Sequence, residues 1–257
     1  MKHKSKLRFG KEKLKHFLVL IILFVIGILL VLLIQPTYIE SIILVYFPST
    51  IYTLGLLRKS KRKILLFALA SILFILPVEL LARMTNSWDV SSIFPRLLGI
   101  APLENIVYAL VNLIYPLAFY EYFFDNDRNR NISSRWKILV TAYLILFIST
   151  FSLYFIAPDI IQFDYWMIGL AIFIPVFILL FTQKAHILKR LVIPAVFFAL
   201  MFGIHEIVSM SLGHWWWPGS YLLPLEIFGH IYPVDDLVIW LLFSVIGVIS
   251  GYEALWD

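Results

Sequence analysis

The chain contains no cysteine among its 257 residues. Disulfide bonds, cysteine-ligated zinc, iron–sulfur clusters and thiol nucleophiles are therefore excluded. Several sequence motifs are also absent: there is no G-x-G-x-x-G dinucleotide loop, no Walker phosphate loop and no G-x-S-x-G nucleophile elbow. The segment HEIVS (205–209) lacks the last histidine of the zincin motif H-E-x-x-H. We expect neither a cofactor nor a metal ion.

Charged residues are scarce as well. They make up 14% of the chain, whereas hydrophobic residues make up 61%, and the mean hydropathy is +0.91. This composition is typical of an integral membrane protein and not of a soluble domain with a large core. We therefore predict an all-α fold, a polytopic membrane helix bundle.

Eight apolar runs approach the roughly 20 residues that a helix needs to cross a bilayer. The first run could be a signal peptide, but it lacks a small-residue cleavage site and leads into another apolar run, so we keep it as a span. The predicted spans are 17–34, 38–57, 64–82, 97–122, 138–157, 164–182, 191–212 and 233–254.

Lysine and arginine gather in segments that alternate with loops almost free of them. Of 21 such residues, 19 lie in 1–16, 58–63, 125–137 and 184–190. The positive-inside rule places these segments, and both termini, on the cytoplasmic side of the cell membrane. The basic excess then reflects topology and contact with anionic membrane lipid. A nucleic-acid partner is not expected, and the sequence indicates no oligomeric state.

The chain also resembles itself at an offset of 127 residues. ELLARMTNSW (79–88) aligns with EIVSMSLGHW (206–215), and after a four-residue insertion PLEN (102–105) aligns with PVDD (233–236). Each unit holds four spans, an even number, so the units form a parallel repeat with a site expected at their interface. The predicted organisation is a basic cytoplasmic arm at 1–16, a first membrane repeat at 17–130 and a second at 131–257.

Both repeats place acidic residues in the outer third of the predicted membrane. These residues are Glu79, Glu104, Glu206, Asp235 and Asp236. Ionisable residues at such depth usually face a bundle interior or a cavity. Alternatively, they are interfacial and favour helix starts through the macrodipole. That alternative is about equally good for the two aspartates and weaker for Glu104, because the preceding LLGIA is apolar.

Three further residues near these acids are candidates for substrate contact. Trp88 and Trp215 either line a pocket or belong to the aromatic belt at the membrane interface. His205 adjoins Glu206 but points about 100° away from it on a helix, so a buried core histidine is the alternative interpretation.

The chemistry that remains is that of carboxyl groups among hydrocarbon and aromatic side chains. A carboxyl group in such surroundings stays protonated and can deliver its proton to a poor base. In a membrane pocket, one such base is a carbon–carbon double bond of an isoprenoid. The resulting cation can be stabilised by aromatic faces, which 22 Phe, 13 Tyr and 8 Trp provide. A second carboxylate would remove a proton to end the reaction.

The duplicated pattern of Trp followed by PLEN in one half, and by PVDDLVIW and YE in the other, resembles the membrane lycopene cyclase domain family. That resemblance covers about 40–257 and implies a cyclase of isomerase type that closes rings at the ends of linear carotenoids without net redox change. It assigns the catalytic acids to Glu104, Asp235 and Asp236. Asn105 departs from the family pattern, which usually has a second acid there, and Asp235 stands where Glu is usual.

We therefore expect Glu104 to donate the proton, with Asp235 or Asp236 as its partner or as the terminating base. Asn105 would orient the donor by hydrogen bonding. Glu79 and Glu206 would lie around the catalytic residues and help to bind the substrate. The expected partner is a lipid-soluble isoprenoid substrate. The alternatives are a cyclase of another polyprenyl or terpenoid substrate, an ion-coupled membrane carrier, and a non-catalytic scaffold that keeps the fold.

Overall fold

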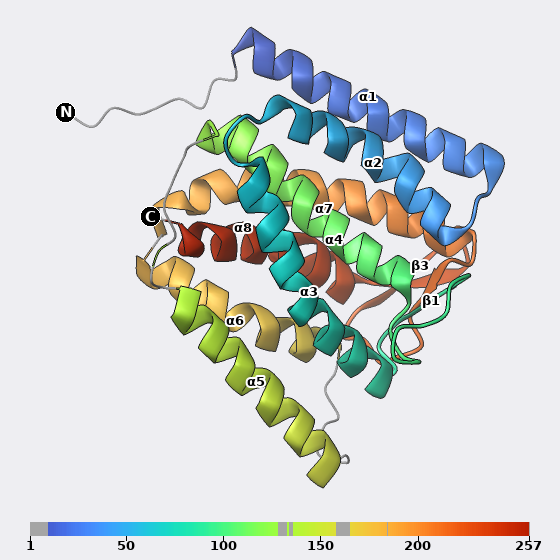
Figure 1. The fold of residues 1–257 in the computed structure, drawn as a ribbon. Helices are drawn as coiled ribbons and strands as arrows, with labels where there is room; N and C mark the ends of the chain where they lie inside the picture. The colour runs from blue at the N-terminus through green and yellow to red at the C-terminus, as the bar shows by residue number, and fades with distance from the viewer. Residues whose placement is uncertain (1–9, 128–132, 134–135, 158–164, 184, 257) are drawn as a thin grey trace.

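The computed structural model describes residues 10–127, 133, 136–157, 165–183 and 185–256. Helices run along the length of the molecule and short strands gather at one end, as Figure 1 shows, so the expected all-α fold is confirmed. The α-helices are α1 (Lys11–Ile34), α2 (Tyr38–Leu56), α3 (Lys61–Met84), α4 (Leu103–Tyr120), α5 (Trp136–Ile156), α6 (Tyr165–Gln183), α7 (Leu188–Ser211) and α8 (Ser244–Leu255). Shorter elements are the π-helices η1 (Glu121–Asp125) and η4 (Asp236–Phe243), the 3₁₀ turn η3 (Ala185–Ile187), and the strands β1 (Asp89–Val90), β2 (Trp215–Trp216), β3 (Pro224–Ile227) and β4 (His230–Pro233).

Six helical segments in the described part of the chain are long and apolar enough to cross a membrane, which indicates a membrane protein. They are Lys11–Ile34, Tyr38–Leu56, Lys61–Met84, Leu103–Asp125, Ala185–Ser211 and Asp236–Leu255. Two further stretches, Trp136–Ser149 and Ile172–Thr182, are apolar but shorter.

The first helix begins earlier than the sequence suggested. It starts at Lys11, so part of the predicted basic arm at 1–16 is helical. The rest of that arm, at 1–9, and most of the basic loop between the two halves lie outside the described residues.

Two other helices begin later than predicted, for local reasons. The span expected to start at 97 begins at Leu103, because Leu97 pairs with Ala101 in a tight turn and Pro102 then occupies the helix N-cap. The span expected to start at 233 begins at Asp236, because β4 precedes it.

Strands β3 and β4 form an antiparallel hairpin outside the helices. Its turn residues, Phe228 and Gly229, have φ of 51° and 78°, as a two-residue hairpin turn requires. The Phe228 side chain is exposed at the tip. The segment 224–233 therefore forms a surface hairpin.

The helices pack in matching sets. α1 packs on α2 and α2 on α4, just as α5 packs on α6 and α6 on α8. Likewise α3 packs on α4 and α7 packs on η4. α1 and α5 lie at opposite edges of the bundle in Figure 1. Close approach of α1 to α2 requires Gly27, since a Cβ there would lie 2.7 Å from the carbonyl oxygen of Leu44.

Equivalent helices share their bounds and their C-terminal hydrogen bonds. The bounds of α2 and α3 reappear in α6 and α7 at an offset of 127 residues. After α3, the amide of Ser87 donates to the carbonyl of Ala82 at 2.8 Å, and after α7 the amide of His214 donates to that of Ser209 at the same distance. The loops that follow then meet, because β1 pairs antiparallel with β2, with Asp89 opposite Trp216.

Candidate functional site

A cavity of about 290 Å³ lies inside the bundle between α3, α4, α5, α6 and α8. Most of its wall is apolar, and it follows α3 from Phe67 to Glu79, a rise of about 18 Å. Its volume is near the lower end of the range for small-molecule sites. The predicted site residues that line it are Glu79, Trp88, Asn105, Glu206, Trp215 and Asp236.

One group of cavity residues is a pair of carboxyl groups from the second half of the chain. Glu206 projects from α7 and Asp236 from the start of η4, and their carboxyl groups lie close together. Both are almost fully buried, with 2% and 1% exposure. Two carboxylates so close together in a buried site repel each other, which favours retention of a proton by one of them.

Two tyrosines complete the surroundings of Glu206. The hydroxyl of Tyr108, on α4, donates to Glu206 Oε1 at 2.9 Å, and that of Tyr232, on β4, donates to Oε2 at 3.3 Å. Burial, followed by the nearby Glu206 and Asp236 carboxyl groups, raises the pKa of Tyr232 above its usual value. Its hydroxyl therefore keeps its proton and can act as a donor.

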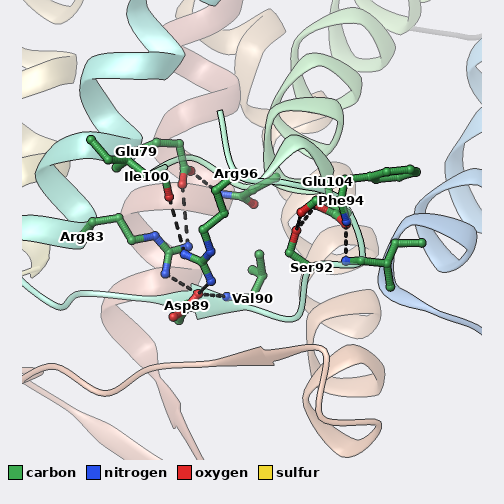
Figure 2. A network of polar contacts seen from close by, with 11 residues as sticks. Glu79, Arg83, Asp89, Val90, Ser92, Phe94, Arg96, Ile100 and Glu104 are labelled. Atoms are coloured by element: carbon green, nitrogen blue, oxygen red, sulfur yellow. Dashed lines mark hydrogen bonds and ion pairs between the residues drawn. The ribbon is translucent and has the colours of Figure 1, made fainter. Parts of the chain in front are cut away.

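A second group of polar residues comes from the first half of the chain, and here the glutamate has an amide and an arginine as neighbours instead of a second carboxyl group. The amide nitrogen of Asn105 donates to Glu79 Oε1. Glu79 Oε2 lies 4.0 Å from Arg83 Nη2, one helical turn away on α3. Arg83 also forms an ion pair with Asp89, to which Arg96 Nη2 donates at 2.9 Å (Figure 2). Glu79 is thus bound to an amide donor and lies beside a cation.

Asp89 holds this charge network together outside the helices. Partial burial would raise the pKa of Asp89, but the hydrogen bond from Arg96 and the charge of Arg83 outweigh it, so the pKa lies below its usual value. Asp89 therefore remains ionised at neutral pH and keeps both arginines at the outer end of α3.

The structure places Glu104, the predicted proton donor, in contact with an outer loop. Its carboxylate accepts hydrogen bonds from Ser92 Oγ at 2.7 Å and from the amides of Ile93 and Phe94 at 2.7 and 3.1 Å (Figure 2). It is not among the cavity-lining residues. Three donors favour the ionised form of a carboxyl group, so Glu104 fastens the outer loop and is poorly suited to donate a proton.

Asp235 also contacts an outer loop. Its Oδ2 accepts a hydrogen bond from the amide of Leu222 at 2.6 Å, and it does not line the cavity. It corresponds to Glu104 in the alignment of PLEN with PVDD, and both carboxylates anchor an outer loop. The next residue in each motif, Asn105 or Asp236, faces the cavity. The π-helix η4 starts at Asp236, and such π turns recur at functional sites.

His205 is likewise not among the residues that line the cavity. Its Nε2 is 3.2 Å from Ser41 Oγ and 3.3 Å from Ser209 Oγ, and its ring packs against Tyr46 with centroids 4.9 Å apart. It is fully buried. The alternative interpretation, a core histidine, fits these contacts.

Four residues at the site were missed by sequence reasoning: Arg83, Tyr108, Tyr232 and Trp240. Signals for three of them were present. Arg83 lies outside the four basic segments and four residues after Glu79, which is the spacing of a helical ion pair. Tyr108 is three residues after Asn105 and shares its face of α4. Trp240 ends the motif PVDDLVIW, four residues after Asp236. Nothing local pointed to Tyr232.

Within the described residues, no group of three or more His, Asp or Glu side chains is arranged to hold a metal ion. Comparisons with protein-family models, with curated proteins and with solved structures find no match to this chain.

Proposed function

We propose that this chain is an integral membrane isoprenoid cyclase that begins ring closure by protonating a carbon–carbon double bond. Linear carotenoid ends of the lycopene type are the favoured substrate, and other polyprenyl chains are the alternative. One observation carries the proposal: two buried carboxyl groups, Glu206 and Asp236, lie close together at the wall of an apolar, aromatic-lined cavity, where their mutual repulsion favours retention of a proton. A protonated acid shielded from water is what an alkene requires, since an alkene is a very weak base.

The first step moves one proton from the singly protonated carboxyl pair to a terminal double bond, leaving two carboxylates and a carbocation. Trp88, Trp215 and Trp240 line the same cavity, and their ring faces stabilise a cation. Attack by a second double bond closes the ring, and loss of a proton from carbon gives the cyclic product. The product is an isomer of the substrate, so no oxidant or reductant is consumed.

The cavity dimensions favour binding of one end of a long substrate. A volume of about 290 Å³ suits a terminal group and not an entire carotenoid. The long apolar wall along α3 gives that end a path through the bundle.

The proposed topology has eight spans in two parallel repeats, with both termini cytoplasmic. It is supported by the 127-residue offset between the bounds of α2–α3 and α6–α7, and by the β1–β2 register at the same offset. Described basic residues at the starts of α1, α3 and α7 lie at the end of the bundle opposite the strands, which favours a cytoplasmic position for that end.

The first test is expression in bacteria that accumulate lycopene, followed by chromatography of the pigments. We expect cyclic products from the parent chain. Glu206→Gln and Asp236→Asn should lower their formation at least about 100-fold, because a positioned general acid contributes about 10²–10⁴ in rate.

Glu226→Gln is the matched control, since Glu226 is exposed on the β3–β4 hairpin and does not line the cavity. It should form products at the parental rate, with all proteins compared at equal membrane content. Parental rates in both cavity variants would refute the assignment of the acid. Unchanged lycopene with the parent chain redirects the assay to shorter polyprenyl substrates, and proton-driven uptake into proteoliposomes would favour a carrier instead.

A further inference from the structure

The two halves of the chain place a glutamate at matching positions on the cavity wall but surround it differently. Glu79 and Glu206 are 127 residues apart, on α3 and α7. At the position of Arg83, one turn after Glu79, the second half has Met210. At the motif position where the second half has Asp236, the first half has Asn105. Both differences favour a more ionised Glu79 and a more protonated Glu206.

Charge balance in the first half favours an ionised Glu79. Arg83 and Arg96 carry two positive charges, and Asp89 supplies one negative charge between them. A carboxylate at Glu79 makes the network neutral, whereas a protonated Glu79 leaves one positive charge uncompensated near the membrane interior. The Asn105 amide donates to Glu79 and supports the same form.

The second half has the opposite arrangement. Glu206 lies beside another carboxyl group, that of Asp236, and accepts hydrogen bonds from the hydroxyl groups of Tyr108 and Tyr232. Ionisation of both carboxyl groups would place two like charges in contact within a buried site, so the pair retains a proton. The hydroxyl groups can then stabilise the second negative charge that appears when this proton leaves.

We infer that the two halves divide the reaction, with the Glu206–Asp236 pair as the acid and the Glu79 carboxylate as the base that ends it. This inference rests on the proposed cyclase function. Because both groups line one cavity, a substrate end can contact both without leaving the site. Glu79 thereby becomes a catalytic residue, and Arg83 and Asn105 become positioning residues that hold it in its basic form.

The proton balance closes over one turnover. The pair gives one proton to the double bond, and the ring-closing step forms a carbon–carbon bond from the second double bond. The Glu79 carboxylate then takes a proton from the carbon next to the cation, and that C–H electron pair becomes the new double bond. Water that enters after product release carries the proton from Glu79 back to the pair. The substrate is isomerised and the protein is restored.

The first experiment needs no substrate and uses the full chain in lipid nanodiscs. Infrared spectroscopy in H₂O and D₂O detects the carbonyl band of protonated carboxyl groups through its isotope shift. At neutral pH, Glu206→Gln or Asp236→Asn should remove this band, whereas Glu79→Gln and the surface control Glu226→Gln should leave it. Asn105→Asp, which gives Glu79 a carboxyl neighbour like that of Glu206, should add a second band. A band lost in Glu79→Gln and retained in Glu206→Gln would overturn the division.

The second experiment follows products, on whichever linear isoprenoid the parent chain cyclises. Glu79→Gln should still consume substrate but shift the products toward other double-bond isomers and water-trapped alcohols, while Glu79→Asp should restore the parental product. Glu206→Gln should not consume substrate. Parental products at the parental rate from Glu79→Gln would refute its role as the base.

The two experiments separate two kinds of failure. If the parent chain cyclises no isoprenoid, the proposed function fails, and the infrared bands still decide whether the halves differ in protonation.

Discussion

At the scale of single residues, the decisive distinction is between neighbours in the same motif. Glu104 and Asn105 differ by about 100° around α4, so one meets the outer loop and the other faces the cavity. Asp235 and Asp236 repeat this division at the start of η4. In each motif, the first of the two adjacent polar residues therefore positions a loop, and the second lines the cavity.

A substitution at Glu104 separates these two roles. Glu104→Gln removes the charged acceptor of three hydrogen bonds, so we expect a loss of stability of about 1–3 kcal/mol and a lower melting temperature. Cyclisation per folded molecule should remain within a few-fold of the parental rate. Thermal unfolding and product analysis on the same purified sample would measure both. Abolished turnover in a sample that melts like the parent would instead make Glu104 a proton donor.

At the scale of helices, an aspartate from the end of one element fixes the start of another. Asp127, just after η1, accepts hydrogen bonds from the amides of Arg58, Lys59 and Ser60 and from Ser60 Oγ at 2.5 Å. Ser60 is the N-cap of α3, so these bonds satisfy backbone donors at the start of that helix. This contact ties the C-terminal end of the α4–η1 segment to the α2–α3 turn.

The pH dependence of this contact follows from the Asp127 pKa. Partial burial would raise it, but the Ser60 hydroxyl and the three backbone amides outweigh burial and hold it below its usual value. Asp127 therefore stabilises the fold at pH values above the ordinary aspartate pKa, about 3.9, and this contribution is lost as the pH falls through the lower folded-state value.

Asp127→Asn tests the contribution of the Asp127 charge to stability. Asparagine also tolerates the local φ of 50°. Because the side chain is partly exposed, we expect a loss of only about 1 kcal/mol at pH 7. The difference in melting temperature from the parent should shrink toward pH 3. Glu226→Gln on the exposed hairpin serves as the control. A difference that stays constant between pH 7 and pH 3 would contradict the role of charge.

At the scale of the whole molecule, the absence of cysteine makes the proposed orientation directly measurable. Lys59 is exposed in the α2–α3 turn, and Glu226 is exposed on the hairpin at the opposite end. Glu226→Cys should react with a membrane-impermeant maleimide in intact cells, and Lys59→Cys only after permeabilisation. The reverse pattern would invert the topology.

The predictable part of this molecule is the part set by composition and periodicity. Apolar runs give the helices, and the spacing of Glu79 and Glu206 places two acids at one end of the bundle. The roles of Glu104 and Asp235 were not predictable, because they depend on how loops 10 or more residues earlier in the chain fold back over α4 and η4. The contact between Glu206 and Tyr232 likewise requires the β3–β4 hairpin, whose pairing has no local signal strong enough to place it.

The register of β1 against β2 has a consequence for how such a molecule could arise. Asp89 faces Trp216, the residue that occupies its own position in the other half, so the ladder is centred on a two-fold relation. Two copies of one four-helix polypeptide could form this same isologous contact as a homodimer. In a symmetric dimer of identical chains, every substitution appears in both copies. Fusion into one chain removes this constraint, so one half can have Arg83 where the other has Met210, and Asn105 where the other has Asp236.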